Sequence, residues 1–442
     1  MRSVLSVKKL TVLLVLPLAL AACDTFGKKK KDPIPGERIS VLALEKQLEP
    51  DPDLASLQVE LPRPAVNQNW PQASGVPAHV MEHPALSDSL KEAWQADVGE
   101  GASRYAEVLA GPVVADGVVY AKDSKSQVTA FRAADGKQQW QVDVAPEDND
   151  GQAWGGGISY DGGKLFVTTG YGQVVALNAA DGKEAWRTNL GIPMREAPTI
   201  ADGHVLVVDV DNEIFALNEA TGEKQWTYAG IPETAELAGG SSPAVENGTV
   251  VVPFSSGELV ALRIENGRTV WQDSLAATRR FDAISTLADI HGRPVIDRGR
   301  VIAVSHSGRV ASIDLRTGER AWEQEVGGTY TPWVAGDFIY LLSTGGEVIC
   351  LTRADGRVRW LTQLDQWEDM EDKSGPIHWA GPILAGDRLI VVASNGQAWS
   401  LSPYTGKALG RIDLPEGSFL SPVVADNTLY LMTNDGQLTA LR

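Results

Sequence analysis

Short apolar runs separated by turn residues recur along most of the chain, and residues 198–227 show the pattern well. Each run is only a few residues long, which is the length of a short strand. The runs occupy 198–200, 205–208, 214–217 and a stretch ending near Thr227, with Asp202-Gly203, Asp211-Asn212 and Thr221-Gly222 between them. Tight turns between short runs predict four antiparallel strands joined as hairpins.

A frame of eleven residues marks each copy of this unit. It consists of a small residue, a large apolar residue, a turn containing Gly, three mostly polar residues and Trp. The complete frames are 130–140, 176–186, 216–226, 261–271, 312–322 and 350–360. A degenerate copy at 400–410 has Gly410 in place of Trp. A period of roughly 40 to 50 residues indicates one repeated structural unit, not a series of unrelated domains.

One four-stranded sheet cannot bury both of its faces, so the copies must cover one another. Radial stacking around an axis achieves this and predicts a β-propeller, an all-β fold. The frames end at Trp140, Trp186, Trp226, Trp271, Trp322, Trp360 and Gly410, and Trp94 adds an eighth site upstream. We therefore expect an eight-bladed β-propeller of four-stranded antiparallel blades.

The last blade is expected to be closed by an N-terminal strand. The final copy starts at Ser421-Pro422 and reaches Arg442 after three of the eleven frame residues. Near the other end, Lys91–Trp94 repeats the four letters of Lys183–Trp186 without upstream strands to belong to. The simplest assembly makes this segment the fourth strand of the last blade.

The repeated Trp is expected to join blades and not to contact a ligand. Burial of an indole removes roughly 150 to 250 Å² from water, which is a large hydrophobic contribution. We expect the small first residue of the frame to leave room for an indole from a neighbouring sheet. The frame Gly is expected to serve the turn.

Charge excludes one class of partner. The chain has 39 Lys and Arg against 57 Asp and Glu, a formal charge of -18, and the repeats carry no basic stripe. Phosphate backbones are bound by clustered Lys and Arg, so nucleic acid is not expected as a partner.

The first 22 residues are typical of a targeting segment. Basic residues precede an apolar run at 10–22 that is short for a membrane span and ends in Leu20–Cys23. This ending resembles a bacterial lipobox, which implies that residues 1–22 are a lipoprotein signal peptide and that Cys23 is lipidated. The alternative is a plain secretory signal with a chance Cys.

Residues 23–75 are expected to form a lipidated, Pro-rich tether ahead of a propeller at 76–442. Prolines at 33, 35, 50, 52, 62, 64 and 71 disfavour both helix and sheet. Within the tether, residues 39–48 form either a short helix on a partner or plain linker. Lysines 28–31 either lie against anionic headgroups or are solvated.

The sequence offers no constellation for catalysis, metal binding or a small-molecule substrate. The six His residues, at 79, 83, 204, 291, 306 and 378, show no metal-ligand spacing. Phosphate-binding and nucleophile-elbow motifs are absent from the sequence. With Cys23 lipidated, only Cys350 remains, so no disulfide is expected. Cys350 stands in the small-residue position of its frame and is expected to be buried and inert. We expect no enzyme activity and no cofactor.

The frame resembles the tryptophan-docking motif of pyrroloquinoline quinone propellers across residues 86–442. Two classes share this motif: quinoprotein dehydrogenases and the BamB family of outer-membrane assembly lipoproteins. The enzymes resemble longer chains with a vicinal Cys pair and a calcium site, and this sequence has no Cys pair. The lipobox, the tether and the eight copies resemble the BamB family instead.

That resemblance implies a non-catalytic scaffold of the outer-membrane β-barrel assembly (BAM) complex. It further implies binding to the periplasmic domains of BamA and to other BAM subunits, and attachment to the membrane through the lipid. The alternative is a quinone-dependent dehydrogenase or another periplasmic ligand-binding propeller. Asp24 resembles a residue that retains lipoproteins in the inner membrane of enteric bacteria, whereas the assembly role implies the outer membrane, facing the periplasm.

The resemblance also implies residues that bind the partner. One family element matches "GIPMREAPT", which gives Ile192, Met194 and Arg195. The other matches "LADIHGRPV", which keeps Asp289 but has His291 where the family has a second acid.

Both segments precede a Pro-initiated inner strand, so we expect Arg195 and Asp289 to project from one face, two blades apart. The alternative is two unrelated exposed loops. A further connection, 361–380, is acidic and aromatic and is either an interaction site or a solvated flap.

Overall fold

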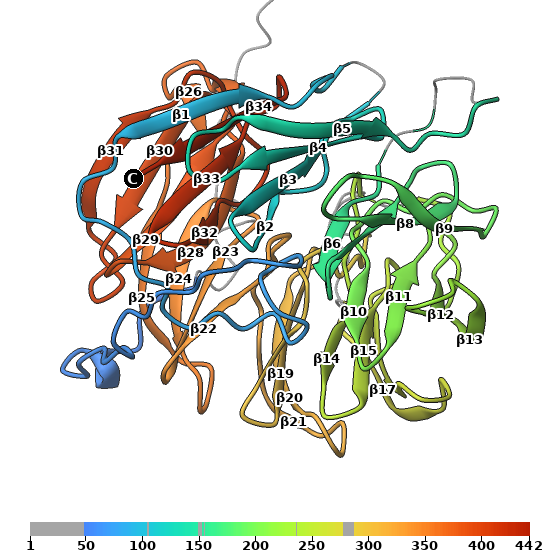
Figure 1. Ribbon diagram of the computed structural model, residues 1–442. Helices are drawn as coiled ribbons and strands as arrows, with labels where there is room; N and C mark the ends of the chain where they lie inside the picture. Colours follow the sequence, from blue (N-terminus) through green and yellow to red (C-terminus); the bar gives the residue numbers. More distant parts are fainter. Residues whose placement is uncertain (1–47, 104–105, 149–152, 154, 236, 277–286) are drawn as a thin grey trace, which may run out of the picture. The chain divides into compact units, whose positions relative to one another are not determined.

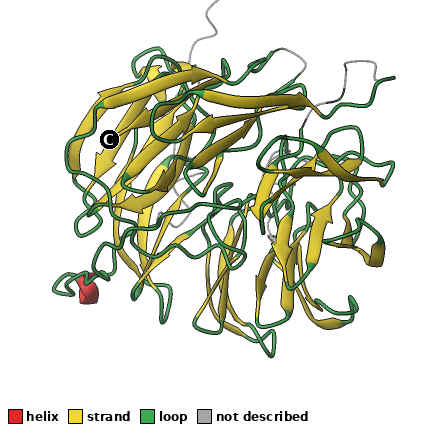
Figure 2. Cartoon of the chain, in the orientation of Figure 1, coloured by secondary structure: helices red, strands yellow, loops and turns green. Residues whose placement is uncertain are grey.

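The computed structural model describes residues 48–442 except 104–105, 149–152, 154, 236 and 277–286. The predicted signal peptide, Cys23 and the tether up to residue 47 lie outside the described residues. Among the described residues, no helix has the length and apolar character needed to cross a membrane. The helical colour in Figure 2 marks a single short 3-10 turn, Pro52–Leu54.

Eight four-stranded antiparallel sheets follow one another along residues 92–442, which confirms the eight-bladed propeller (Figure 1). In blades 1 to 4 the strands are β2 (Val113–Ala115), β3 (Val118–Lys122), β4 (Gln127–Arg132), β5 (Gln138–Asp143); β6 (Ile158–Asp161), β7 (Lys164–Thr168), β8 (Gln173–Asn178), β9 (Glu184–Asn189); β10 (Thr199–Ala201), β11 (His204–Val208), β12 (Glu213–Asn218), β13 (Lys224–Ala229); and β14 (Ala244–Glu246), β15 (Thr249–Pro253), β16 (Glu258–Arg263), β17 (Thr269–Ser274). From blade 1 to blade 7 the inner strands of successive blades are in contact, so neighbouring sheets pack against one another.

The remaining blades have the same plan. Their strands are β18 (Val295–Asp297), β19 (Arg300–Ser305), β20 (Arg309–Asp314), β21 (Arg320–Gln324); β22 (Trp333–Ala335), β23 (Phe338–Leu342), β24 (Glu347–Thr352), β25 (Val358–Gln363); β28 (Trp379–Ala385), β29 (Arg388–Ala393), β30 (Gln397–Leu401), β31 (Ala408–Asp413); and β32 (Val423–Ala425), β33 (Thr428–Met432), β34 (Gln437–Leu441) with β1 (Glu92–Asp97). A small hairpin, β26 (Trp367–Asp369) and β27 (Ser374–Pro376), lies in the connection between blades 6 and 7.

Blade 3 shows why this sequence folds into such sheets. Between β10 and β11, Asp202 and Gly203 both have positive φ (48° and 77°), which is the turn that best matches the twist of a hairpin. The second and third strands are almost wholly buried, whereas the outer strand β13 alternates between exposed and half-buried residues. The apolar runs therefore occupy the middle of the blade and the polar frame residues its outer edge.

Blade 8 contains both a C-terminal and an N-terminal segment, in the order β1-β34-β33-β32 (Figure 1). Trp94 in β1 lies opposite Ala440 in β34. This is the same pairing that Trp186 makes with Ala176 inside blade 2. Residues from the two ends of the ring thus meet in one sheet and share the register of a continuous frame.

Each frame Trp joins its own blade to the next one. The indole Nε1–H donates to the carbonyl of the fourth frame residue in the following blade at 2.7 to 3.1 Å. The seven acceptors are the carbonyls of Ala133, Ala179, Glu219, Ile264, Leu315, Arg353 and Pro403. These bonds fix the angle between neighbouring blades, and the packing of the ring against the next blade removes it from water.

The frame Gly is what receives the indole of the preceding blade. Gly222 has φ +74°, and a Cβ placed on it would lie 2.5 Å from the Trp186 ring. The small first residue instead lies opposite the Trp of its own blade, as Ala176 does with Trp186. Our expectation that the small residue accommodates the neighbour's indole is therefore wrong, and the Gly serves both the turn and the docking.

The exception at Gly410 has a structural reason. A Trp there would point toward blade 8, where the third and fourth strands, β34 and β1, come from distant parts of the sequence. No frame turn joins those strands, so neither the acceptor carbonyl nor the frame Gly is present for an indole. All six residues of β31 are exposed as a result, including Leu409 at 60%.

Residues 49–88, here called the strap, lie on the propeller and contact all eight blades. In blade order, the bonded groups are Val114 N–H, Tyr160 N–H, Ile200 N–H, Val245 N–H, Ile296 N–H, the Trp333 indole N–H, Gly386 N–H and Asp426 N–H. Their acceptors in the strap are the carbonyls of Trp70, Pro71, Pro77, Ala78, Glu82, Pro84 and Asn67, and the Gln72 side chain. The strap is the blue segment that precedes β1 in Figure 1.

The described part of the predicted tether is therefore bound to the ring and is not a free linker. Prolines do prevent this segment from forming a regular helix or strand, as we expected. A proline still has a carbonyl, however: Pro71 and Pro77 use theirs to accept inner-strand N–H groups, and Pro84 accepts the N–H of Gly386 in the turn after β28. The strap thus satisfies donors that would otherwise face the central channel.

Candidate interaction face

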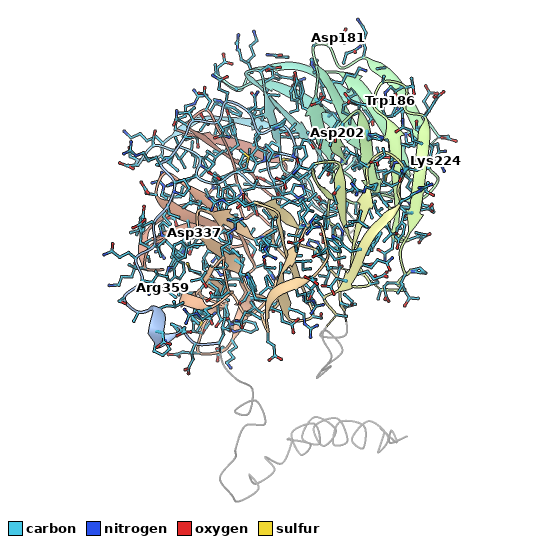
Figure 3. The ribbon with its side chains drawn as sticks, turned by 90° about the horizontal axis from the view of Figure 1, so that it is seen from below. Asp181, Trp186, Asp202, Lys224, Asp337 and Arg359 are labelled. Carbon is cyan, nitrogen blue, oxygen red and sulfur yellow. The ribbon has the colours of Figure 1, made fainter. Side chains whose placement is uncertain are left out.

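The connections between blades all emerge at one face of the propeller. Each runs from the outer strand of one blade to the inner strand of the next. Asp181 and Asp202, labelled in Figure 3, belong to turns within blades 2 and 3, at the other end of the strands. The connections 190–198, 230–243 and 275–294 therefore share a face, as the frame predicts. We call their described residues the interaction face.

The predicted residues of the first connection differ in exposure. Met194 is 0% exposed and packs in a core with Phe166 and Phe215, while its N–H donates to the Thr169 carbonyl at 3.2 Å. The expectation that Met194 offers an apolar surface to a partner is therefore wrong. Ile192 and Arg195 are half-buried. Met194 fixes the connection, and its neighbours remain accessible.

Asp289 is buried as well, with 5% of its surface exposed. Its carboxylate accepts the Leu237 N–H at 3.1 Å, and its carbonyl accepts the His306 N–H at 2.8 Å. Burial raises the pKa of the Asp289 carboxyl, while the nearby His291, the Leu237 N–H and His306 oppose that rise. Asp289 thus does not project from the face as expected, because its carboxylate holds the neighbouring connection.

His291 joins three connections. Its Nδ1 lies 2.9 Å from the Thr329 carbonyl, and its Nε2 lies 3.0 Å from the Ala238 carbonyl. A carbonyl can only accept, so a ring with one N–H satisfies one of these contacts and the doubly protonated ring satisfies both. The residue that replaces the family's second acid is therefore part of the loop scaffold.

The connection 230–243 fills the space between the two predicted segments. A Cβ on Gly239 would lie 2.7 Å from His291 Nε2, and one on Gly240 would lie 3.3 Å from Glu196. Arg195 and Asp289 line one small cavity of about 30 Å³ beneath these glycines. The structure thus brings the predicted segments together, with a third connection between them that we did not predict.

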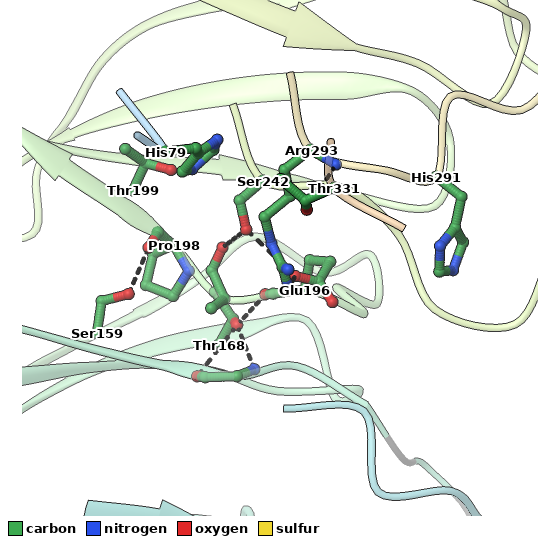
Figure 4. Close-up of polar contacts among 12 residues, drawn as sticks. His79, Ser159, Thr168, Glu196, Pro198, Thr199, Ser242, His291, Arg293 and Thr331 are labelled. Carbon is green, nitrogen blue, oxygen red and sulfur yellow. Dashed lines mark hydrogen bonds and ion pairs between the residues drawn. The ribbon is translucent and has the colours of Figure 1, made fainter. Parts of the chain in front are cut away.

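An ion pair links the first and third connections directly. Arg293 Nη2 lies 2.6 Å from Glu196 Oε2, and the side chains are 23% and 10% exposed. Ser242 Oγ donates to the same Glu196 oxygen at 3.2 Å and to the Ala197 carbonyl at 2.8 Å. Figure 4 shows Arg293 and Glu196 pointing toward one another below Ser242.

Further bonds extend this network into the blades. The Thr168 hydroxyl donates to the Glu196 carbonyl at 2.5 Å, and the Arg293 N–H donates to the Thr331 hydroxyl at 3.3 Å (Figure 4). An ion pair that is largely removed from water does not by itself stabilise a protein, but loss of one partner leaves an uncompensated charge. Glu196 and Arg293 therefore impose one arrangement on the three connections.

Sequence reasoning missed Glu196, Ser242 and Arg293, although a signal was present. Each stands one or two residues before the Pro that precedes an inner strand, at Pro198, Pro243 and Pro294. Alignment on that Pro places an acid, a hydroxyl and a base in nearly equivalent positions. Because equivalent positions of a propeller face the same axis, the three side chains were candidates for a network.

The acidic connection is a hairpin in its described part. Strands β26 and β27 pair, and the Trp379 indole donates to the Asp365 carbonyl at 2.7 Å. Met370 at the tip of the hairpin is 60% exposed. Among the described residues, no group of three or more His, Cys, Asp or Glu is placed to hold a metal. Cys350 is buried as expected, and burial raises the pKa of its thiol far above the usual range.

Comparison with known proteins identifies relatives over the propeller. The family model for outer membrane protein assembly factor BamB matches residues 85–152, 147–362 and 364–442. The outer membrane protein assembly factor BamB of Yersinia pestis is 30% identical over 358 residues, covering 80% of this chain and 88% of the relative. That of Escherichia coli (strain K12) is 31% identical over 354 residues, covering 79% and 88%. The matched residues begin at 85, after most of the strap.

Solved structures share the fold. The crystal structure of BamB from Moraxella catarrhalis has a TM-score of 0.68 at 22% identity, covering 80% of this chain and all of that one. Quinohemoprotein alcohol dehydrogenase from Comamonas testosteroni has a TM-score of 0.66 at 15% identity, covering 85% and 81%. At these identities the likeness concerns the propeller fold alone, so the structures do not separate a scaffold from a dehydrogenase.

Proposed function

The chain belongs to the family of outer membrane protein assembly factor BamB, and from this premise we propose that it is a non-catalytic scaffold of the BAM complex. Its task is to hold partner subunits while β-barrel proteins are inserted into the outer membrane. The assembly factors align over about four fifths of this chain, whereas the dehydrogenase likeness is one of fold alone.

The partner is the periplasmic region of BamA, and the interaction face is where it binds. The observation that carries this assignment is the network of Glu196, Arg293, Asp289 and His291, which locks three connections into one surface. Preorganised loops lose little conformational entropy on binding, and they therefore suit a permanent scaffold. Ile192, Arg195 and His291 contact the partner, while Met194 and Asp289 hold the connections from below.

The attachment to the membrane follows from the N-terminal sequence. Residues 1–22 are removed as a signal peptide, Cys23 receives the lipid, and the residues up to the strap form the tether. The protein then lies in the periplasm, anchored to the outer membrane. Other BAM subunits share the assembly, and neither a cofactor nor a small-molecule substrate is involved.

Arg195→Glu is the variant that tests this function. Arg195 is half-buried on the same connection as the half-buried Ile192. A guanidinium in such a position is typical of an interface anchor, since it pairs with carboxylates or carbonyls while apolar neighbours exclude water. Reversal of its charge should weaken binding by about 2 kcal/mol, which is roughly 30-fold in Kd. Calorimetric titration of the soluble periplasmic region of BamA into the purified propeller measures this.

Lys183→Glu is the matched control. Lys183 is exposed in a turn of blade 2 at the opposite face, where its ammonium contacts Asp181 at 2.8 Å. This variant makes the same change in net charge, so it should bind BamA as wild type does. Circular dichroism and the thermal midpoint verify that both variants are folded. Equal affinities for the two variants would remove Arg195 from the interface.

A further inference from the structure

A cavity of about 660 Å³ lies on the propeller axis. Its walls come from the start of the inner strands and from the connections of the interaction face, and its floor comes from the strap. We call it the axial pocket. A volume of this size is typical of sites that enclose a drug-sized ligand or a few residues of a partner.

The strap forms a fixed floor. Trp70, Gln72 and His79 all line the pocket. The Trp70 ring stacks on Trp333 with 6.2 Å between centroids, and the Gln72 amide both donates to the Ile200 carbonyl and accepts its N–H. Gln72 thus contacts the middle of β10, and Trp70 contacts the first residue of β22. Elsewhere the strap bonds the N–H groups of Gly386 and Asp426, which lie in turns at the face opposite the interaction face. The axial pocket is therefore built to be entered from the interaction face.

One wall of the pocket is aromatic. It is formed by Tyr330 from the connection to blade 6, Trp333 at the start of β22 and Phe419 from the connection to blade 8. The Tyr330 hydroxyl donates to the Phe419 carbonyl at 3.1 Å, and His378 packs against the Phe419 ring at 5.8 Å. Phe419 is nevertheless 44% exposed, so a large apolar side chain stands at the rim without being covered.

The charged and titratable groups beside the aromatic wall and in the floor are neutralised. The Arg293 guanidinium is paired with Glu196. Burial, with the nearby Arg293 charge, lowers the pKa of His79 to about 3, although its hydrogen bond to the Pro294 carbonyl opposes the shift. His79 is therefore neutral, and Nδ1 carries the proton that it donates to that carbonyl at 2.8 Å. Glu107 also lines the pocket, but it is exposed to solvent. A charged occupant would find no uncompensated counter-charge among the buried groups, whereas an uncharged one would lose little solvation free energy on entry.

The pocket and the interaction face share residues. Leu237, Ala238, Gly239, His291 and Arg293 line the pocket and belong to the connections 230–243 and 275–294. A protein that binds the interaction face therefore covers the mouth of the pocket. Buried interface anchors are typically large side chains inserted into such a depression, ringed by contacts that exclude water.

We propose that the axial pocket receives an uncharged apolar or aromatic side chain projected by the protein that docks on the interaction face. The proposal rests on the proposed function, because the same partner supplies the side chain. The inserted side chain packs against the aromatic wall, and its backbone contacts the neutralised polar groups. The strap, as the floor, limits how deep the side chain can enter.

Ala238→Trp tests the proposal by filling the mouth of the pocket. Ala238 is exposed and lines the pocket, and its carbonyl contacts His291 Nε2, so a substitution of its side chain keeps that contact. We expect binding to the periplasmic region of BamA to weaken at least about tenfold. Ala180→Trp is the matched control, because Ala180 is an exposed turn residue at the opposite face, and it should bind as wild type does. Phe419→Ala, which removes the rim side chain without adding bulk, should also weaken binding.

The outcomes separate this proposal from the proposed function. One outcome contradicts the pocket proposal alone: Arg195→Glu weakens binding to BamA, but Ala238→Trp and Phe419→Ala bind as tightly as Ala180→Trp. The partner then binds the interaction face without inserting a side chain into the pocket. If wild type does not bind BamA at all, both proposals fall. Thermal midpoints of the variants establish that each is folded, and Phe419→Ala decides the question if Ala238→Trp is not.

Discussion

Deletion of residues 86–96 is expected to lower the thermal unfolding midpoint by more than about 10 °C. The deletion removes most of β1, and with it the fourth strand of blade 8 and the Trp94 indole that docks on blade 1. Loss of a buried Trp alone costs roughly 3 to 5 kcal/mol. It also exposes the edge of β34 and separates blade 8 from blade 1, so the ring can open. Differential scanning calorimetry of the purified propeller measures the change.

Deletion of residues 367–376 is the matched control for the closing strand. It removes a hairpin of nearly the same length, whose flanking residues are already joined by the Ile377 N–H and the Gln366 carbonyl at 2.9 Å. The blades keep all their strands, so the midpoint should change little. A closing-strand deletion that unfolds at the same temperature as this control would show that β1 does not close the ring.

Deletion of residues 49–84 is expected to lower the midpoint by roughly 5 °C or more while the propeller still folds. All eight sheets consist of strands that follow residue 84, so we expect the propeller to form without the strap. The deletion leaves N–H groups of the inner strands without their partners and uncovers Trp333, which packs against the buried Trp70. Far-UV circular dichroism should retain its β signal, and calorimetry should record the lower midpoint.

Trp70→Ala offers a check on the cause of that effect. This variant keeps the strap backbone and removes the buried ring, so it should account for part of the loss, about 3 kcal/mol or more. A strap deletion with an unchanged midpoint would mean that the contacts of residues 49–84 contribute no stability. The blades would then be independent of the strap.

The strands and turns of each blade could be predicted from sequence, because they depend on neighbouring residues and the same pattern recurs in every blade. Turn chemistry at Asp202-Gly203 and the alternation around it determine a hairpin without reference to the rest of the chain. The position of Trp94 relative to Trp186 gave the register of the closing strand, since one unit is copied eight times. The direction in which each indole points was harder to predict, because the surface on which it docks belongs to the next copy. Trp186, for example, docks on Gly222 of the following blade.

The strap and the details of the interaction face could not be predicted in the same way. Proline content predicts what a segment cannot form, but it does not show that Pro71, Pro77 and Pro84 will meet unpaired N–H groups. Met194 and Asp289 stand in loops, where burial depends on what packs above them. Met194 packs against Phe166 and Phe215 of blades 2 and 3. Asp289 is covered by the connection 230–243, whose position follows from contacts with Asp289 and His291 that no local pattern encodes.

Hydrogen exchange of the propeller with and without the periplasmic region of BamA is the most direct test of the central claim, that this protein binds its partner through the interaction face. The account predicts slower exchange on binding for amides in 190–198, 237–243 and 287–294, which the network of Glu196 and Arg293 holds together. Amides of the turns at the opposite face, such as Gly203 and Gly222, should exchange at unchanged rates. Protection confined to those turns, or to the outer strands, would contradict the account.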